Sequence, residues 1–209
     1  GTKTGTGFPG ESAGLLTKSE DWSGTQRATV AFGQGLSVTA IQAAGVFQTI
    51  ANNGVRVEPR LIESTTDKDG TVKQTPASKG SRVVDEKVAK QVSEMLEGVV
   101  SPNGTAPQAQ IAGYRVAGKT GTADRYDPTV GGYSGKTASF IGYAPADDPQ
   151  IVVAVILQRP TNGYFGGSTA GPAFHDVMTY ALQDPKTTPT GTAAPQLVLD
   201  VEPSAAEAD

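Results

Sequence analysis

Tyr114-Arg-Val-Ala-Gly-Lys-Thr-Gly-Thr-Ala123 begins with strand-forming residues and ends on a tetrad, Lys119 to Thr122, that combines one cation, two hydroxyl groups and a glycine. Two further β-rich stretches follow at 137–143 and 150–158, and the short segment 144–149 connects them. Consecutive strands joined by short connections pair in an antiparallel sense. The sequence therefore predicts an antiparallel sheet whose first strand, from Tyr114 to Thr122, carries the tetrad.

Helices are predicted before and after these strands, because apolar residues recur at helical spacing over 38–52, 85–99 and 170–182. The residues expected at the helix ends are Ser37 or Thr39, Asn53-Gly54 and Asp85. The apolar faces of the second and third helices comprise Val88, Val92, Met95, Leu96 and Val99, and Phe174, Val177, Met178 and Ala181. Helices followed by a run of strands and a closing helix indicate an α+β fold.

The rest of the chain is predicted to be less regular. Residues 55–63 alternate around Pro59 and favour an edge strand, and a turn at 67–70 leads into a short polar return strand. We expect loops at 1–14, 101–112 and 124–136. The ordered domain is expected to cover 1–183, with a disordered tail at 184–209.

Composition excludes several classes of function. The 209 residues include no Cys and one His, His175, so a Cys/His zinc site, an iron–sulfur cluster and a thiol nucleophile are ruled out. Catalysis would have to use Ser, Thr, Lys, Tyr or carboxylates. The net charge of −4, without a basic stripe, argues against nucleic acid as a partner. The longest apolar run, 151–157, is far shorter than the roughly twenty residues that span a bilayer.

Residues 113–120 match the nucleotide-binding pattern G-x-x-x-x-G-K-[ST] letter for letter. A phosphate-binding loop needs a strand before the pattern and a helix after it. Here the interior of the pattern is itself strand-like, and Gly, Pro and Asp follow Thr122. The match is therefore interpreted as coincidence.

The tetrad fits better on a strand that faces a cleft. Lys119 supplies a point charge, Thr120 and Thr122 supply hydroxyl donors toward a carboxylate, and Gly121 lets a ligand lie against the backbone. Such a strand can bind a peptide by β-addition. The plainer alternative is a surface strand end with an incidental lysine. A second copy, Lys3-Thr4-Gly5-Thr6, lies in an aperiodic glycine-rich loop and is interpreted as coincidence.

Six blocks, one of which contains the tetrad, give it a context. They are Phe8-Pro9-Gly10-Glu11; Ala31-Phe32-Gly33-Gln34-Gly35 with Val38-Thr39-Ala40-Ile41-Gln42; Ile50-Ala51-Asn52-Asn53-Gly54; Gly104-Thr105-Ala106; Val116 to Ala123; and Ser139-Phe140-Ile141-Gly142-Tyr143-Ala144-Pro145. In order and spacing these blocks, over about 5–182, resemble the transpeptidase domain of class B penicillin-binding proteins, most closely the monofunctional, division-type branch.

The resemblance implies a penicillin-binding/serine β-lactamase-like fold, an antiparallel sheet flanked by helices, present here as its C-terminal half. It implies a peptidoglycan D,D-transpeptidase that cross-links stem peptides through a serine acyl-enzyme, without metal or cofactor, and that β-lactams acylate. Lys119 would then supply positive potential to the substrate carboxylate, and the hydroxyls of Thr120 and Thr122 would bind it beside Gly121. The backbone N–H of Thr122 would form half of the oxyanion hole.

The resemblance also implies where such a protein works. The expected location is the extracytoplasmic face of a bacterial cell membrane, with an anchoring helix outside this chain. The expected partners are peptidoglycan stem peptides, β-lactams, the N-terminal remainder of the same protein, and the cell-division or elongation machinery.

The family's nucleophile motif, S-x-x-K, is missing, because no serine here has a lysine three positions later. The S-x-N pattern occurs as Ser101-Pro102-Asn103, but the family has its motif well upstream, so Ser101 and Asn103 are not assigned catalytic roles. The chain therefore carries one wall of the site and lacks the nucleophile. Two strands of the family sheet precede this region, so the strand 151–157 should expose an apolar edge, and the isolated chain should fold poorly.

A few other residues have weaker claims. His175 is interpreted as a packed or surface helix residue, and Trp22 as an anchor for its loop. Asp124, Arg125, Tyr126 and Tyr133 follow the tetrad and are candidates for substrate contact. Two alternative functions stay open, namely a related serine hydrolase such as a carboxypeptidase or β-lactamase, and a non-catalytic module of the same fold that binds peptide or a partner.

Overall fold

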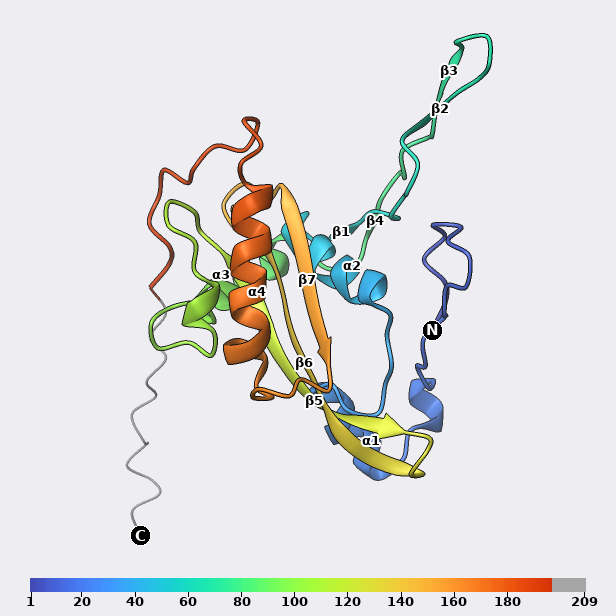
Figure 1. Cartoon of the computed structure of the whole chain (residues 1–209), viewed down its shortest axis with the longest axis vertical. Helices are drawn as coiled ribbons and strands as arrows, with labels where there is room; N and C mark the ends of the chain where they lie inside the picture. The colour runs from blue at the N-terminus through green and yellow to red at the C-terminus, as the bar shows by residue number, and fades with distance from the viewer. Residues whose placement is uncertain (197–209) are drawn as a thin grey trace.

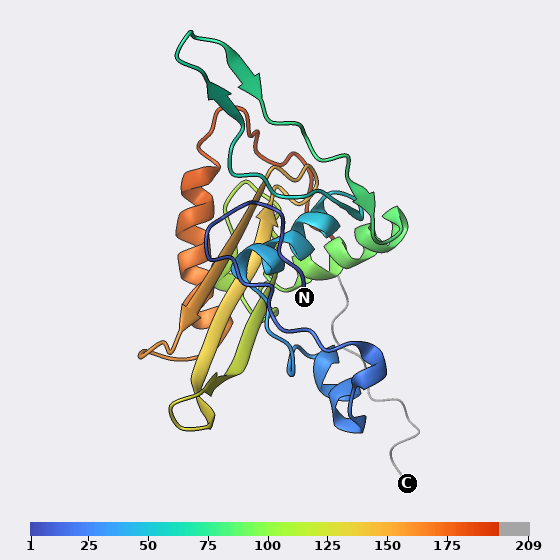
Figure 2. The ribbon, with the colours of Figure 1, turned by 90° about the vertical axis from the view of Figure 1, so that its right-hand side faces the viewer.

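The computed structural model describes residues 1–196 and centres on one antiparallel sheet (Figure 1). Its strands are β5 (Ala117–Asp127), β6 (Gly132–Ala144) and β7 (Ile151–Gln158), in the spatial order β5-β6-β7. Helix α4 (Gly166–Ala181) covers one face, and helices α2 (Ala40–Ala51) and α3 (Glu86–Gly98) cover the other (Figure 2). The predicted antiparallel strand set and the α+β class are confirmed.

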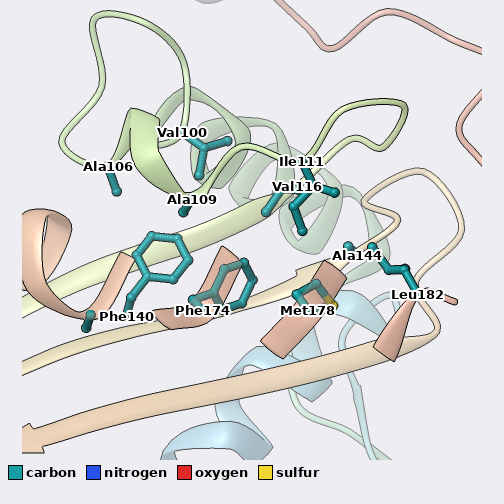
Figure 3. Packing of buried hydrophobic residues seen from close by; sticks show 11 residues of the cluster. Val100, Ala106, Ala109, Ile111, Val116, Phe140, Ala144, Phe174, Met178 and Leu182 are labelled. Atoms are coloured by element: carbon teal, nitrogen blue, oxygen red, sulfur yellow. The ribbon is translucent and has the colours of Figure 1, made fainter. Parts of the chain in front are cut away.

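The face of the sheet under α4 carries the larger part of the core (Figure 3). Phe140 of β6 and Phe174 of α4 are fully buried, and their rings meet edge to face with centroids 4.6 Å apart. Such a geometry adds about 0.5–1.5 kcal/mol to the burial of the two rings. Met178 packs one helical turn further along α4, so this helix is held along its length against β6.

Helix α2 covers the opposite face and confirms the prediction for 38–52. Thr39 caps it with a capping box, in which its hydroxyl accepts the Gln42 N–H and the Gln42 side chain accepts the Thr39 N–H. Asn53 at φ 52° and Gly54 at φ 84° provide the left-handed stop. Below the helix, Tyr143 of β6 is fully buried and its hydroxyl donates to Ser93 Oγ at 2.8 Å.

Two of the predicted helical faces are buried only in part. In α3, Leu96 and Val99 pack against the core, whereas Met95 and Val88 are exposed. In α4, Val177 is half exposed, so the buried stripe is narrower than the sequence predicted.

Helix α4 also begins four residues earlier than predicted, at a pair of glycines. A Cβ on Gly166 would lie 2.3 Å from the Ser139 carbonyl oxygen, and a Cβ on Gly167 would lie 2.0 Å from the Thr105 carbonyl oxygen. Real Cβ atoms do not approach that closely. The two glycines allow the first turn of the helix to lie against the sheet.

The segment 55–82 forms a projecting arm rather than the long edge strand predicted at 55–63 (Figure 1). Strand β1 (Val55–Arg56) is short and pairs with β4 (Ser81–Arg82). Beyond them, β2 (Ser64–Thr66) and β3 (Val72–Gln74) pair as a hairpin around the predicted turn at 67–70. Three short elements that the sequence did not predict are η1 (Ser19–Asp21), α1 (Gly24–Ala31) and η2 (Pro107–Ala109).

The loop predicted at 124–136 is instead a β-hairpin that prolongs β5 and β6. A bulge lies opposite Arg125, where Gly135 adopts φ 77°, and this irregularity hid the strand pattern. At the tip, the buried carboxylate of Asp127 accepts the N–H and hydroxyl of Thr129 and pairs with Arg159. These contacts make the hairpin a continuation of the sheet.

Residues 184–196, within the segment for which disorder was expected, follow the surface of the domain. The Thr190 hydroxyl accepts the Arg115 N–H at 3.1 Å and donates to Asp147 at 3.0 Å. The Arg115 guanidinium makes a two-pronged pair with the buried Glu97 and also donates to Thr192. The structure therefore differs from the expectation over 184–196, and residues 197–209 of the predicted tail lie outside the described part.

Candidate active site

The tetrad lies on an edge strand. Within residues 1–196, β5 pairs with β6 on one side and with no strand on the other. The backbone N–H of Arg159 donates to the carbonyl of Lys136, so these two residues form a hydrogen-bonded pair. This pair fixes which residues of β6 turn their backbone toward β7 and which turn it toward β5. Hydrogen bonding alternates along antiparallel strands, so Lys119 and Gly121 turn their backbone toward β6. The backbone N–H and C=O groups of Thr120 and Thr122 consequently point to the free edge.

Side chains alternate in the perpendicular direction. Thr120 and Thr122 lie on the α4 side of the sheet, as does their neighbour Phe140, whereas Lys119 and Gly121 lie on the α2 side. The Thr122 hydroxyl accepts the N–H of Gly166, the first residue of α4, at 3.1 Å. An oxygen that accepts from an amide keeps its own proton free to donate. Thr122 therefore ties α4 to β5 and still presents a donor.

Lys119 and Thr120 form one polar cluster. The Lys119 ammonium folds back and donates to the Thr120 carbonyl at 3.1 Å and to the Thr120 hydroxyl at 3.2 Å. The Thr120 hydroxyl lies 3.1 Å from that of Thr105. Lys119 is exposed, and none of the ion pairs of the described residues involves it. A cation and two hydroxyl donors in this arrangement can bind an anionic group such as a carboxylate.

A side chain at Gly121 would displace the Ser139 hydroxyl. A Cβ at this position would lie 2.4 Å from Ser139 Oγ on the paired strand β6. The glycine was predicted as an open floor for a ligand, and the structure adds a cross-strand reason for it.

The residues that were set aside have other contacts. Ser101 donates its hydroxyl proton to the Gly98 carbonyl at the end of α3, and Asn103 lines a separate cavity of about 980 Å³. His175 contacts the Gln110 carbonyl through Nδ1, which fits a packed helix residue. In the second tetrad copy, Thr4 is bonded to Glu11, and this hydrogen bonding lowers the pKa of the Glu11 carboxyl. Trp22 donates its indole N–H to the Thr17 carbonyl and so anchors its own loop.

The candidates in the hairpin after the tetrad are held by neighbours. Asp124 pairs with Lys136 across the strands, and Tyr126 meets Tyr133 edge to face with centroids 6.2 Å apart. Arg125 reaches across the sheet and donates to the Gln158 side chain at 2.9 Å. Both tyrosines are exposed, so they remain candidates for contact with a substrate.

Sequence reasoning missed several residues that build the site. Thr105 and Gly166 come from segments far from the tetrad in sequence, and Ser139 lies across the strand pair. The signal for Thr105 and Ser139 was present, since both lie in the blocks that carried the family resemblance. Tyr164 and Phe165, an exposed aromatic pair just before α4, were also missed.

The arrangement provides a cation and hydrogen-bond donors at the free edge of β5. Among the described residues, no group of three or more His, Asp or Glu side chains could hold a metal ion. The helices of that part of the chain are all too short or too polar to cross a membrane. What the edge of β5 can do chemically is bind a carboxylate and, through the Thr122 N–H, stabilise a developing oxyanion.

Comparisons with known proteins agree with this geometry. Residues 1–179 match the family model of the penicillin-binding protein transpeptidase domain. The chain is 42% identical over 193 residues to penicillin-binding protein PbpB of Mycolicibacterium smegmatis, covering 88% of this chain and 30% of that protein. It is 36% identical over 185 residues to the probable peptidoglycan D,D-transpeptidase PenA of Neisseria gonorrhoeae, covering 87% of this chain and 30% of that protein.

A solved structure is also similar. Penicillin-binding protein 3 of Mycobacterium tuberculosis, in its complex with ampicillin, superposes with a TM-score of 0.89 at 39% identity. The match covers 97% of this chain and 47% of the solved chain. The chain thus spans less than half the length of these relatives.

Proposed function

The chain belongs to the transpeptidase domain family of class B penicillin-binding proteins, and from this premise we propose that the protein containing it is a peptidoglycan D,D-transpeptidase. The observation that carries the proposal is the free edge of β5, where the Lys119 to Thr122 tetrad offers a cation, two hydroxyl protons and an outward backbone N–H. The substrates are peptidoglycan stem peptides, and β-lactams are the inhibitors.

The tetrad binds the substrate at two points. The terminal carboxylate of a D-alanyl-D-alanine peptide accepts hydrogen bonds from the hydroxyls of Thr120 and Thr122, near the Lys119 ammonium. Each such charged hydrogen bond is worth about 1.5–3 kcal/mol. The carbonyl under attack lies against the Thr122 N–H, which stabilises the oxyanion of the tetrahedral intermediate by roughly 3–4 kcal/mol.

The nucleophile comes from the part of the protein outside this chain. A serine there attacks the carbonyl, and a neighbouring base takes its proton and passes it to the amide nitrogen. The bond to that nitrogen breaks, the terminal D-alanine leaves as an amine, and an acyl-enzyme remains. The amine of a second stem peptide then attacks the ester carbon, releases the serine and completes the cross-link. A β-lactam undergoes only the first step. The serine opens its ring and forms an ester, but the amine remains attached to the acyl group and does not depart.

Location and partners follow from this role. The substrate is a cell-wall peptide, so we place the site on the extracytoplasmic face of the bacterial membrane, in contact with the division or elongation machinery. The similarity to PenA of Neisseria gonorrhoeae, a probable peptidoglycan D,D-transpeptidase, favours transpeptidation over the carboxypeptidase and β-lactamase reactions.

Product analysis tests the proposal. The intact protein is incubated with a stem pentapeptide donor and an amine acceptor, and the products are identified by mass spectrometry. A cross-linked peptide is expected. Shortened donor peptide without a cross-link would indicate a carboxypeptidase, and an unchanged donor together with no acylation by penicillin would indicate a non-catalytic module.

A further inference from the structure

We propose that Thr105 is a positioning residue that directs the Thr120 hydroxyl proton toward the substrate carboxylate. The inference rests on the proposed function, because it assigns a role within the same site. Thr105 lies between α3 and η2, fifteen residues before Thr120, and their hydroxyl oxygens are 3.1 Å apart. Its side chain is exposed and belongs to no other hydrogen bond among the described residues.

The backbone that carries Thr105 is tightly held. A Cβ on Gly104 would lie 2.2 Å from the Val99 carbonyl oxygen, at the end of α3, and a Cβ on Gly167 of α4 would lie 2.0 Å from the Thr105 carbonyl oxygen. The next residue, Ala106, is fully buried and donates its N–H to the same Val99 carbonyl at 2.9 Å. Two helix ends therefore fix the backbone of Thr105, and the contact with Thr120 then orients its hydroxyl.

The hydrogen bonds at the Thr120 hydroxyl explain the role of Thr105. The Thr120 oxygen has two lone pairs and one proton. The Lys119 ammonium, which can only donate, takes one lone pair. When the Thr105 hydroxyl donates to the other, the Thr120 proton has no acceptor among the described residues and can point to the ligand. A hydroxyl that accepts two hydrogen bonds is also polarised into a better donor.

The Thr122 hydroxyl is held in a similar way, because its oxygen accepts the backbone N–H of Gly166. An amide cannot reverse its direction, so Thr122 needs no helper. Thr105 supplies for Thr120 what α4 supplies for Thr122. Without it, Thr120 could rotate, and its proton would be shared with water.

The first test compares Thr105→Val and Thr105→Ser in the intact protein. The readout is the second-order rate of acylation by a penicillin and by the methyl ester of the same penicillin, whose carboxylate is masked. We expect Thr105→Val to lower the rate for the free acid about tenfold and to leave the rate for the ester nearly unchanged. Thr105→Ser should restore the preference for the acid. Thr65→Val, on the projecting arm, is the matched control and should behave as the wild type.

A double-mutant cycle with Thr120→Val separates positioning from direct contact. If Thr105 acts through Thr120, Thr105→Val has little further effect once the Thr120 hydroxyl is gone. Additive losses, an equal loss for acid and ester, or a Thr105→Ser protein as slow as Thr105→Val would each overturn the inference. If Thr105→Val fails to fold, Thr105→Ala replaces it. A wild-type protein that no penicillin acylates would instead refute the proposed function itself.

Discussion

The hydroxyl oxygens of Thr120 and Thr122 each accept a hydrogen bond from within the protein. Lys119 donates to the first oxygen and the N–H of Gly166 to the second. The site is therefore organised before a ligand arrives, and electrostatic stabilisation in enzymes depends on such preorganisation. Individual hydrogen-bond donors and individual glycines therefore determine the geometry of the site.

Gly121 offers a first prediction. A methyl group at this position would meet Ser139 Oγ at 2.4 Å, so Gly121→Ala should lower the free energy of unfolding of the intact protein by about 1–3 kcal/mol. Removing the hydroxyl in Gly121→Ala/Ser139→Ala should recover most of this loss. Denaturant unfolding measures both, and a double variant no more stable than the single one would argue against the cross-strand contact.

Tyr143 predicts a pH dependence. Burial raises the pKa of its phenol above the ordinary value of 10.0, although the hydrogen bond with Ser93 opposes the shift. A raised pKa in the folded state means that the stabilisation is complete below about pH 10 and is lost as the pH rises through the folded pKa. At neutral pH the free energy of unfolding of the wild type should exceed that of Tyr143→Phe by about 1 kcal/mol. That gap should narrow above pH 10 in unfolding experiments, and a gap that widens there would exclude this explanation.

At the scale of elements, the start of α4 determines how the site is assembled. This helix end contacts β5 through Thr122, β6 through Ser139 and the segment after α3 through Thr105. Three parts of the chain therefore meet at Gly166 and Gly167, and no side chain fits between them.

Two glycines of α4 provide a matched pair for a test. Gly167→Ala would place its Cβ 2.0 Å from a backbone oxygen, whereas a Cβ on Gly171 would meet its nearest atoms at 3.9 Å, an ordinary contact. Gly167→Ala should therefore lower the melting temperature of the intact protein by several degrees, since overpacking costs about 1–3 kcal/mol. Gly171→Ala should be neutral or stabilising, because alanine favours a helix by up to about 1 kcal/mol over glycine. Equal melting temperatures for the two variants would contradict the close packing.

The sequence predicted those elements whose signals are local. The helix 40–51 follows from its apolar period, its cap at Thr39 and its glycine stop, and β7 follows from an apolar run rich in β-branched residues. The hairpin over 124–136 was missed because its bulge breaks the alternation of side chains. The tetrad itself was identified from sequence, but Thr105 and Gly166 were not, since only the folded chain brings them to it.

At the scale of the whole molecule, the described residues leave apolar surface uncovered. Phe8, Leu15, Phe32 and Val46 are all more than half exposed, and all lie before or within α2. Strand β7 pairs with β6 and, in residues 1–196, with nothing on its other edge. An open apolar edge favours association with another strand.

The isolated 209-residue chain should therefore fold poorly or associate. We expect early elution in size-exclusion chromatography and weak protection of β7 amides from hydrogen exchange, compared with the same strand in the intact protein. A monomer with strongly protected β7 amides would show that the chain is self-sufficient.

The acylation rate of the intact protein by a fluorescent penicillin tests whether the tetrad on the edge of β5, Lys119 to Thr122, receives the substrate. Lys119→Ala should lower that rate at least about tenfold, because the variant loses a charged hydrogen bond near the carboxylate. Lys3→Ala, in the tetrad copy at the start of the chain, is the control and should acylate as the wild type does. Unchanged acylation of Lys119→Ala, or an equal loss in Lys3→Ala, would contradict the assignment of Lys119 to the substrate site.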